Sequence, residues 1–301
     1  MRTMGGRVNI QKRQCAQGKK EVPSGIISKE DKQMNNTEQI KRIRLYLFDM
    51  DGTLYLGDRL YDFTAELLAE IKKSGGKYMF MTNNSSKSVV DYIKKLERLG
   101  IKAENEDFIT SSQATAYYLE KYHKGARLYV CGTESLKEEL RRGGFEVTDN
   151  IDLVDVIVMG FDTELTFKKL HDVSYMLLTR ENIPYIATNP DYVCPTEFGS
   201  VPDCGSVCDM LYNVSKRRPI FIGKPEPLMP ILAMEKMGYD KEQTAVIGDR
   251  IYTDIKSGLN AGALTILVLS GETTREILES SPEKPHIVME SAREILDILK
   301  S

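Results

Sequence analysis

The stretch LYLFDMDGTLYLG (45–57) places an aspartate at the end of a short apolar run and a second aspartate two residues later. Four apolar residues before Asp49 are typical of a strand that is buried on both faces. Asp51 precedes Gly-Thr, a sequence that favours a turn. Two carboxylates this close repel each other, so we expect positive charge beside them.

From residue 43 onward, short apolar runs alternate with helical patterns in which apolar residues lie three and four apart. This order predicts an α/β protein with a Rossmann-like, doubly wound and mostly parallel sheet. The predicted strands are 44–49, 77–82, 107–110, 127–132, 155–161, 184–188, 219–223, 244–248 and 264–269, and the predicted helices include 64–75, 88–100, 226–238 and 291–300.

Polar side chains occur where several of these strands end. They are Thr82 and Asn83, Asp249 with Asp254 five residues further on, and Lys224. Ligands of such sheets bind beyond the carboxyl ends of the strands, so we expect these side chains to converge with the two aspartates of the first strand. Acidic oxygens clustered without Cys or His favour a hard cation such as Mg²⁺.

A phosphoryl group is the reactant that this set fits. Its charge opposes attack by a carboxylate at a cost of about 4 kcal/mol for unit charges 4 Å apart at an effective dielectric of ~20, which a divalent metal and a lysine offset. A Thr hydroxyl and backbone N–H groups can bind the remaining phosphoryl oxygens. One carboxylate can attack phosphorus while the other donates a proton and then activates water, so no histidine is needed.

DMDGT (49–53), Thr82, Lys224 and GDRIYTD (248–254) resemble the four motifs of the haloacid dehalogenase superfamily, and the resemblance covers residues 43–301. It implies that Asp49 is the nucleophile and forms an aspartyl-phosphate. Asp51 would be the general acid and base, which argues for a phosphatase rather than a dehalogenase. Thr82 and Lys224 would hold the phosphoryl group.

The resemblance also implies a Mg²⁺ site formed by the carboxylates of Asp49 and Asp249 and the backbone carbonyl of Asp51. Asp254 would be a supporting acid near the metal and the lysine. Asn83 is expected to add a supporting contact to the phosphate.

The spacing of the motifs predicts where a cap domain is inserted. Asp51 and Thr82 are 31 residues apart, whereas Thr82 and Lys224 are 142 apart, and the longer interval contains predicted strands of its own. We therefore expect a basic, disordered tail at 1–40, a discontinuous core at 41–112 and 209–301, and an α/β cap at 113–208. MTNNSS (81–86), ATNPD (187–191), CGS (204–206) and GKPEP (223–227) look like the NagD/para-nitrophenylphosphatase subfamily.

That subfamily consists of Mg²⁺-dependent phosphatases of small phosphorylated metabolites, in which the cap selects the substrate. Residues 189–206 are our candidate for part of this roof. A phosphotransferase or phosphomutase on the same fold, a phospho-acceptor signalling domain and a metabolite-binding regulator are the alternatives. Cys194, Cys204 and Cys208 lack the spacing of a zinc site and have no nearby histidine, so we expect ordinary thiols.

The composition of the chain limits the classes of binding partner that we expect. The formal net charge is −3 and no apolar run approaches the ~20 residues that span a bilayer, so we expect neither nucleic acid nor membrane as a partner. The sparse, odd number of cysteines, 5 in 301 residues, favours a reducing, cytoplasmic location. A homodimer formed through the cap is a further expectation from the subfamily resemblance.

Overall fold

A computed structural model of the chain describes residues 29–196 and 198–301. Within these residues, six parallel strands form the first sheet in the order β15-β14-β13-β1-β4-β5. The strands are β1 (Leu45–Phe48), β4 (Lys77–Thr82), β5 (Phe108–Thr110), β13 (Thr244–Gly248), β14 (Leu264–Val268) and β15 (Ile287–Met289). The earliest strand lies inside the sheet, and the chain winds outward from it in both directions, as predicted for a doubly wound fold.

Strand β1 is buried on both faces, which explains its uninterrupted apolar sequence. Tyr46 and Phe48 pack in one apolar cluster with α1, α2, α3 and α11, whereas Leu45 and Leu47 pack in another with α4 and α8. These helices are α1 (Lys29–Arg42), α2 (Thr64–Lys73), α3 (Val89–Arg98), α4 (Ser111–Tyr122), α8 (Leu228–Met237) and α11 (Arg293–Lys300). Helices on both faces of a parallel sheet confirm the predicted class.

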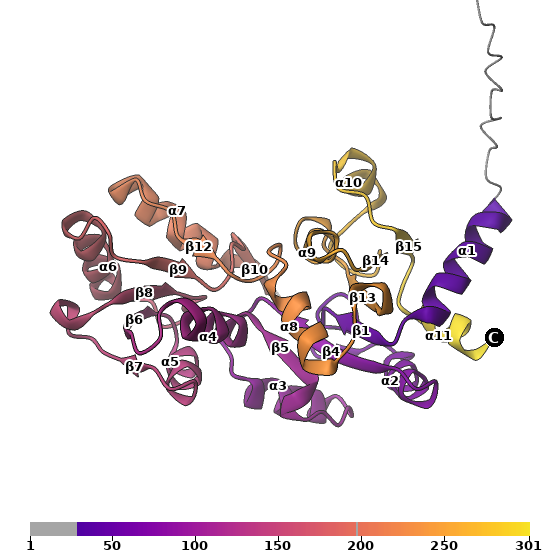
Figure 1. The fold of residues 1–301 in the computed structure, drawn as a ribbon. Coiled ribbons are helices and arrows are strands. Elements are labelled where there is room, and N and C mark those ends of the chain that lie inside the picture. The colour runs from indigo at the N-terminus through magenta and orange to yellow at the C-terminus, as the bar shows by residue number, and fades with distance from the viewer. Residues whose placement is uncertain (1–28, 197) are drawn as a thin grey trace, which may run out of the picture.

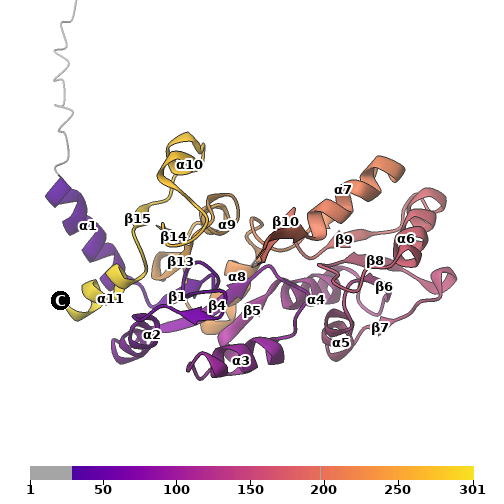
Figure 2. The same ribbon diagram turned by 180° about the vertical axis from the view of Figure 1, so that it is seen from behind.

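A second parallel sheet lies in a separate lobe, with the strand order β12-β9-β8-β6-β7 in the described residues (Figure 1). Its strands are β6 (Arg127–Cys131), β7 (Glu146–Val147), β8 (Val156–Met159), β9 (Tyr185–Ala187) and β12 (Ile220–Phe221), and its helices are α5 (Glu134–Arg142), α6 (Phe167–Thr179) and α7 (Cys204–Ser215). Seen from behind, α4 and α8 lie near the junction of the two lobes (Figure 2). One apolar cluster continues from the first sheet through α4 into the second sheet, so the lobes share a core.

Short elements complete the connections. They are the hairpins β2 (Tyr55–Leu56) with β3 (Arg59–Leu60) and β10 (Val193–Thr196) with β11 (Gly199–Pro202), the helices α9 (Lys256–Ala261) and α10 (Arg275–Ser280), the π-helix Ile251–Ile255, and 3₁₀ turns at Asn105–Asp107, Ile151–Leu153 and Lys241–Gln243. The first hairpin follows Asp51, and the second lies within the predicted roof.

The inserted α/β cap is present, but its sheet does not end where the sequence suggested. The strand predicted at 219–223 pairs with β9 of the second sheet, in the register Ile220 to Ile186. The predicted boundaries near 113 and 208 fall inside α4 and α7. We therefore propose boundaries close to residues 111 and 222, because these positions keep each helix and each sheet whole.

The predicted disordered tail overlaps helix α1. Residues 1–28 lie outside the described residues, but residues 29–42 are helical. Ile40 is fully buried in the apolar cluster of the first sheet, and its carbonyl accepts a hydrogen bond from the Tyr46 hydroxyl at 3.2 Å. Helix α1 lies beside α11 (Figures 1 and 2). Residues 29–40 therefore differ from the predicted tail, because burial of Ile40 orders the end of the segment.

We expect Ile40→Ala to lower the free energy of unfolding by about 2–5 kcal/mol, because it leaves a cavity in the core. The matched control is Ile277→Ala, whose side chain is 45% exposed and should cost about 1 kcal/mol or less. Urea unfolding of both variants measures the difference. Equal losses would show that α1 does not stabilise the core.

Candidate active site

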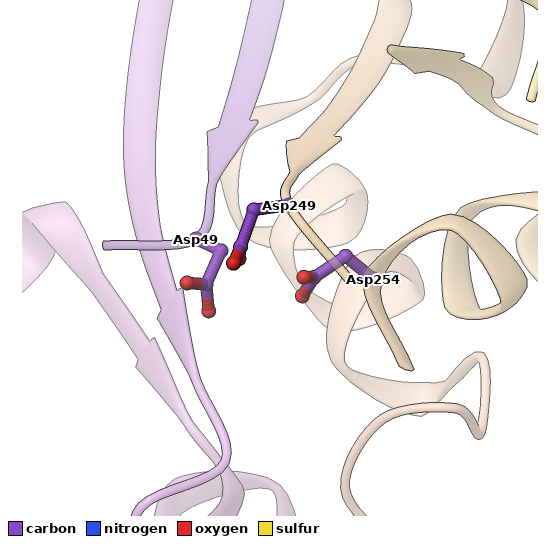
Figure 3. A group of neighbouring side chains, drawn as sticks. All are labelled: Asp49, Asp249 and Asp254. Atoms are coloured by element: carbon purple, nitrogen blue, oxygen red, sulfur yellow. The ribbon is translucent and has the colours of Figure 1, made fainter. Parts of the chain in front are cut away.

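Three aspartates converge at the carboxyl ends of neighbouring strands. Asp49 follows β1, Asp249 follows β13, and Asp254 lies in the π-helix that comes next. A carboxylate oxygen of each lies within 4.8 Å of the others, and Figure 3 shows the three side chains pointing toward one another. The chain reverses its direction of winding between these two strands, which is where open α/β sheets bind ligands.

Lys224 connects two of these carboxylates. Its ammonium donates hydrogen bonds of 2.6 Å to Asp49 Oδ1 and 2.6 Å to Asp254 Oδ1, and a longer one of 3.3 Å to the Met81 carbonyl. The side chain is buried, and burial alone would lower the pKa of Lys224. Asp254 and Asp49 outweigh that effect and raise this pKa, so the lysine stays charged.

Asp249 is the aspartate whose charge is least compensated. Its Oδ2 accepts a 2.7 Å hydrogen bond from the Glu272 backbone N–H, while its buried Oδ1 has no partner within the described residues. Burial, Asp49 and Asp254 together raise the pKa of Asp249 to about 8. Burial also raises the pKa of Asp49 to about 6, although Lys224 acts in the opposite direction. Three carboxylates thus face one ammonium, so the negative charge of the cluster is only partly neutralised.

Two glycines allow the backbone to close around Asp249. A Cβ atom at Gly271 would lie 2.1 Å from Asp249 Oδ2, and one at Gly52 would lie 2.5 Å from the same oxygen. Gly52 also has a φ of +82°, which favours glycine. The Ser270 hydroxyl donates to the Gly52 carbonyl at 2.7 Å and ties the two loops together. Sequence reasoning missed the 270–272 loop, although its glycine after a strand was an available signal.

Asp51 lies apart from the three-carboxylate cluster. It is exposed, lines the same cavity as Asp49, and accepts a long hydrogen bond of 3.4 Å from the Gly57 backbone. Thr82 is buried at the cavity wall, and its hydroxyl oxygen accepts from the Asn84 backbone at 3.2 Å. Their expected roles in proton transfer and phosphate binding stay predictions.

Asn83 fastens Lys224 to the first sheet. Its Oδ1 accepts from the Lys224 backbone N–H at 2.8 Å, and its Nδ2 donates to the Lys224 carbonyl at 2.8 Å and to Asp191 Oδ2 at 3.0 Å. Both ends of the amide are therefore bound to protein. These contacts favour positioning of Lys224 over the phosphate contact that the sequence suggested.

The carboxylate cluster opens into a cavity of about 890 Å³ between the two lobes. The second lobe contributes part of the wall through Asp191, Val193, Cys194, Pro195, Thr196 and Asp203, all within the predicted roof. Lys87, Tyr92, Lys95 and Arg250 also line it, and sequence reasoning gave none of these four a role. A cavity of this size suits a small metabolite.

The cysteines of the roof segment lie at different places. Cys204 and Cys208 are buried on one face of α7 with their sulfurs 4.0 Å apart, and Cys194 lies on β10. In the described part of the chain, the group of side chains that could hold a metal ion consists of Asp49, Asp249 and Asp254 and includes none of these cysteines.

Two family descriptions match this chain. Residues 46–146 match the family described as haloacid dehalogenase-like hydrolase, and residues 221–295 match a HAD-hydrolase-like family. The two matched segments lie on either side of residues 147–220, and the first extends into the second lobe as far as β7.

This chain matches similar proteins over nearly the whole length of those proteins. The 5'-nucleotidase YutF of Bacillus subtilis is 35% identical over 255 residues, which are 85% of this chain and 98% of the relative. The acid sugar phosphatase of Staphylococcus aureus is 35% identical over 246 residues, 82% of this chain and 94% of the relative.

Solved structures give the same result. The 4-nitrophenylphosphatase of Thermotoga maritima has a TM-score of 0.82 and 38% identity, and the match covers 87% of this chain and 98% of that one. NagD of E. coli K-12 has a TM-score of 0.76 and 32% identity, covering 84% and 98%. The chain therefore belongs to the haloacid dehalogenase-like hydrolases, in the group of phosphatases that includes NagD and the 4-nitrophenylphosphatases.

Proposed function

We propose that this phosphatase hydrolyses small phosphorylated metabolites with the help of Mg²⁺ and through a phosphorylated Asp49. The observation that carries the proposal is the Lys224 ammonium, which lies 2.6 Å from both Asp49 and Asp254 beside the uncompensated carboxylate of Asp249. The names of the relatives, a 5'-nucleotidase, an acid sugar phosphatase and a 4-nitrophenylphosphatase, support a phosphomonoester substrate.

The residues present fit a divalent cation. The grouped side chains offer oxygen atoms only, as Mg²⁺ prefers, and the buried Oδ1 of Asp249 lacks a partner within the described residues. The carboxylates of Asp49 and Asp249 and the backbone carbonyl of Asp51 would hold the ion, with Asp254 in support. When bound, the cation would supply charge neutralisation at the phosphoryl oxygens.

In the first step, a carboxylate oxygen of Asp49 attacks phosphorus and the bond from phosphorus to the leaving oxygen breaks. Asp51 gives its proton to that oxygen, so the product leaves as an alcohol. Lys224 and the Thr82 hydroxyl hold the phosphoryl oxygens while charge develops on them. Asn83 keeps Lys224 in place through its two backbone hydrogen bonds.

In the second step, water attacks the phosphorus of the aspartyl-phosphate and gives a proton to the Asp51 carboxylate. The bond between phosphorus and Asp49 breaks, which releases inorganic phosphate and restores both carboxyl groups. Asp51 is exposed at the cavity wall, and this position is compatible with a role in both steps.

The same covalent step would serve a phosphotransferase or phosphomutase if an alcohol replaced water. A signalling domain or a regulator would keep the site but turn over little. Inorganic phosphate released in equal amount to the alcohol product distinguishes hydrolysis from all three.

The proposal also covers the binding partners of the protein and its location in the cell. None of the described helices has both the length and the apolar character required to cross a bilayer. Exposed apolar side chains on α6 and α7, namely Tyr175, Leu178, Met210 and Val214, are compatible with the homodimer that we expect through the cap. The cytoplasmic location and the absence of nucleic-acid binding stay predictions.

Asp49→Asn should lower turnover of para-nitrophenyl phosphate with Mg²⁺ by roughly 10³-fold or more, because an amide cannot act as the nucleophile. The control is Asp297→Asn on the exposed side of α11, which should match the parent protein. Phosphate release measures both variants, and activity close to the parent's in the Asp49 variant would refute the mechanism.

Chelation of the parent by EDTA should stop turnover, and added Mg²⁺ should restore it.

Asp249→Asn should stabilise the metal-free protein at high pH. The pKa of Asp249 is raised to about 8, above the ~3.9 of a free aspartate, so between these values the folded state holds a proton that the unfolded state has lost. Stability present at low pH is therefore lost as the pH rises through about 8. The amide removes this loss, so we expect a gain of roughly 1–3 kcal/mol near pH 9 that shrinks toward pH 5.

Urea unfolding in EDTA at several pH values measures this effect, with Asp297→Asn as the matched control. An Asp249 variant that is less stable than the parent near pH 9 would show that the metal-free site is not short of positive charge.

A further inference from the structure

Two lysines of the cavity wall have no acidic partner. Lys87 precedes the first turn of α3 and Lys95 lies within that helix, and both line the cavity. Among the residues that the structure describes, no carboxylate oxygen lies within 4.0 Å of either ammonium. By contrast, Arg250 is paired with Glu272 at 2.8 Å, and Lys224 is paired with two aspartates.

Lys95 is held in place without an ion pair. It is half-buried, and its ammonium lies 4.1 Å from the centre of the Tyr55 ring. Such a cation–π contact orients a lysine without neutralising it. Tyr55 is itself buried, and its carbonyl accepts from the Gly52 backbone N–H at 2.7 Å. Lys95 is therefore attached to the loop that carries Asp51.

The contact with the Tyr55 ring places Lys95 on the Asp51 side of the cavity, because Tyr55 forms a backbone bridge with Asp51. Burial lowers the pKa of Lys95, Asp51 and Asp58 act to raise it, and Lys87 acts to lower it further. The two lysines thus share one region of the wall, and the acids near them lie beyond ion-pair distance.

The segment that carries both lysines is rigid at its start. The Ser88 side chain accepts from the Asp91 backbone at 3.3 Å, and the Asp91 side chain accepts from the Ser88 backbone at 2.9 Å. This capping box fixes the first turn of α3. Val89, Tyr92 and Leu96 anchor the helix in the core, so the backbone that carries Lys95 has a fixed position at the wall.

The position of Asp51 shows which part of a substrate would meet these lysines. In the function proposed above, on which this inference rests, Asp51 gives a proton to the leaving oxygen, so the leaving group lies on its side of the cavity. We propose that Lys95, assisted by Lys87, selects phosphomonoesters whose leaving group carries a second anionic group. A carboxylate or a second phosphate provides that chemistry, since either can accept hydrogen bonds from the two ammonium groups.

Three esters with the same three-carbon skeleton test this selection. Glycerol 3-phosphate, 3-phosphoglycerate and glycerol 1,3-bisphosphate differ at the far carbon, which belongs to a neutral hydroxymethyl group, a carboxylate or a phosphorylated hydroxymethyl group, respectively. We expect kcat/KM of the parent protein to be about tenfold or more higher for at least one anionic ester than for the neutral one. The better anionic ester identifies the preferred second group.

Lys95→Gln should reduce this preference about tenfold, mainly through KM, and Lys95→Arg should restore most of it because the charge returns. Lys87→Gln should reduce it less, because that lysine is exposed. Lys94→Gln removes the same charge from an exposed position of α3 that does not line the cavity, and the preference should stay as in the parent.

Equal kcat/KM values for all three esters in the parent, with para-nitrophenyl phosphate still hydrolysed, would overturn this inference and leave the proposed function intact. An unchanged preference in Lys95→Gln would also overturn it. A parent protein that hydrolyses no phosphomonoester would instead refute the proposed function.

Discussion

The ammonium of Lys224 lies 2.6 Å from both Asp49 and Asp254, and it holds these two carboxylates together at the strand ends. It brings a charge from the end of the inserted lobe to the strand ends of the first sheet. Without it, three carboxylates would repel one another in a buried site, where such repulsion is poorly screened. Asn83 binds the backbone of the same lysine, so the fold fixes both ends of this residue.

Much of this arrangement could be predicted from the sequence. Parallel strands bring their carboxyl ends to one edge, so residues that follow separate strands must meet there. That reasoning placed Asp49 and Asp249 together, and it also brought in Asp254, which follows the same strand as Asp249. Lys224 reaches this edge as expected, although the strand that it follows, β12, belongs to the second sheet. The 142-residue interval between Thr82 and Lys224 was enough to predict an inserted lobe.

Other features depend on contacts that no local pattern records. The sequence predicts the strand at β12, but its two paired residues join the second sheet, and this pairing depends on the neighbouring strand β9. Asn83 looked like a phosphate ligand because it follows Thr82, whereas its amide is satisfied by Lys224, which is 141 residues away. The close approach of Gly271 to Asp249 is likewise a tertiary contact. The charge pairing on the cavity wall, in which no described acid lies within 4.0 Å of the Lys95 ammonium, is a tertiary property as well.

Identification of the phosphorylated residue tests the proposed covalent mechanism. The protein is mixed with para-nitrophenyl phosphate and Mg²⁺, quenched in acid within its first turnovers, reduced with borohydride and analysed by peptide mass spectrometry. We expect homoserine at position 49, the product of reducing an aspartyl-phosphate, and an unmodified Asp51. Steady turnover with no modified residue, or modification at another position, would refute a phosphorylated Asp49.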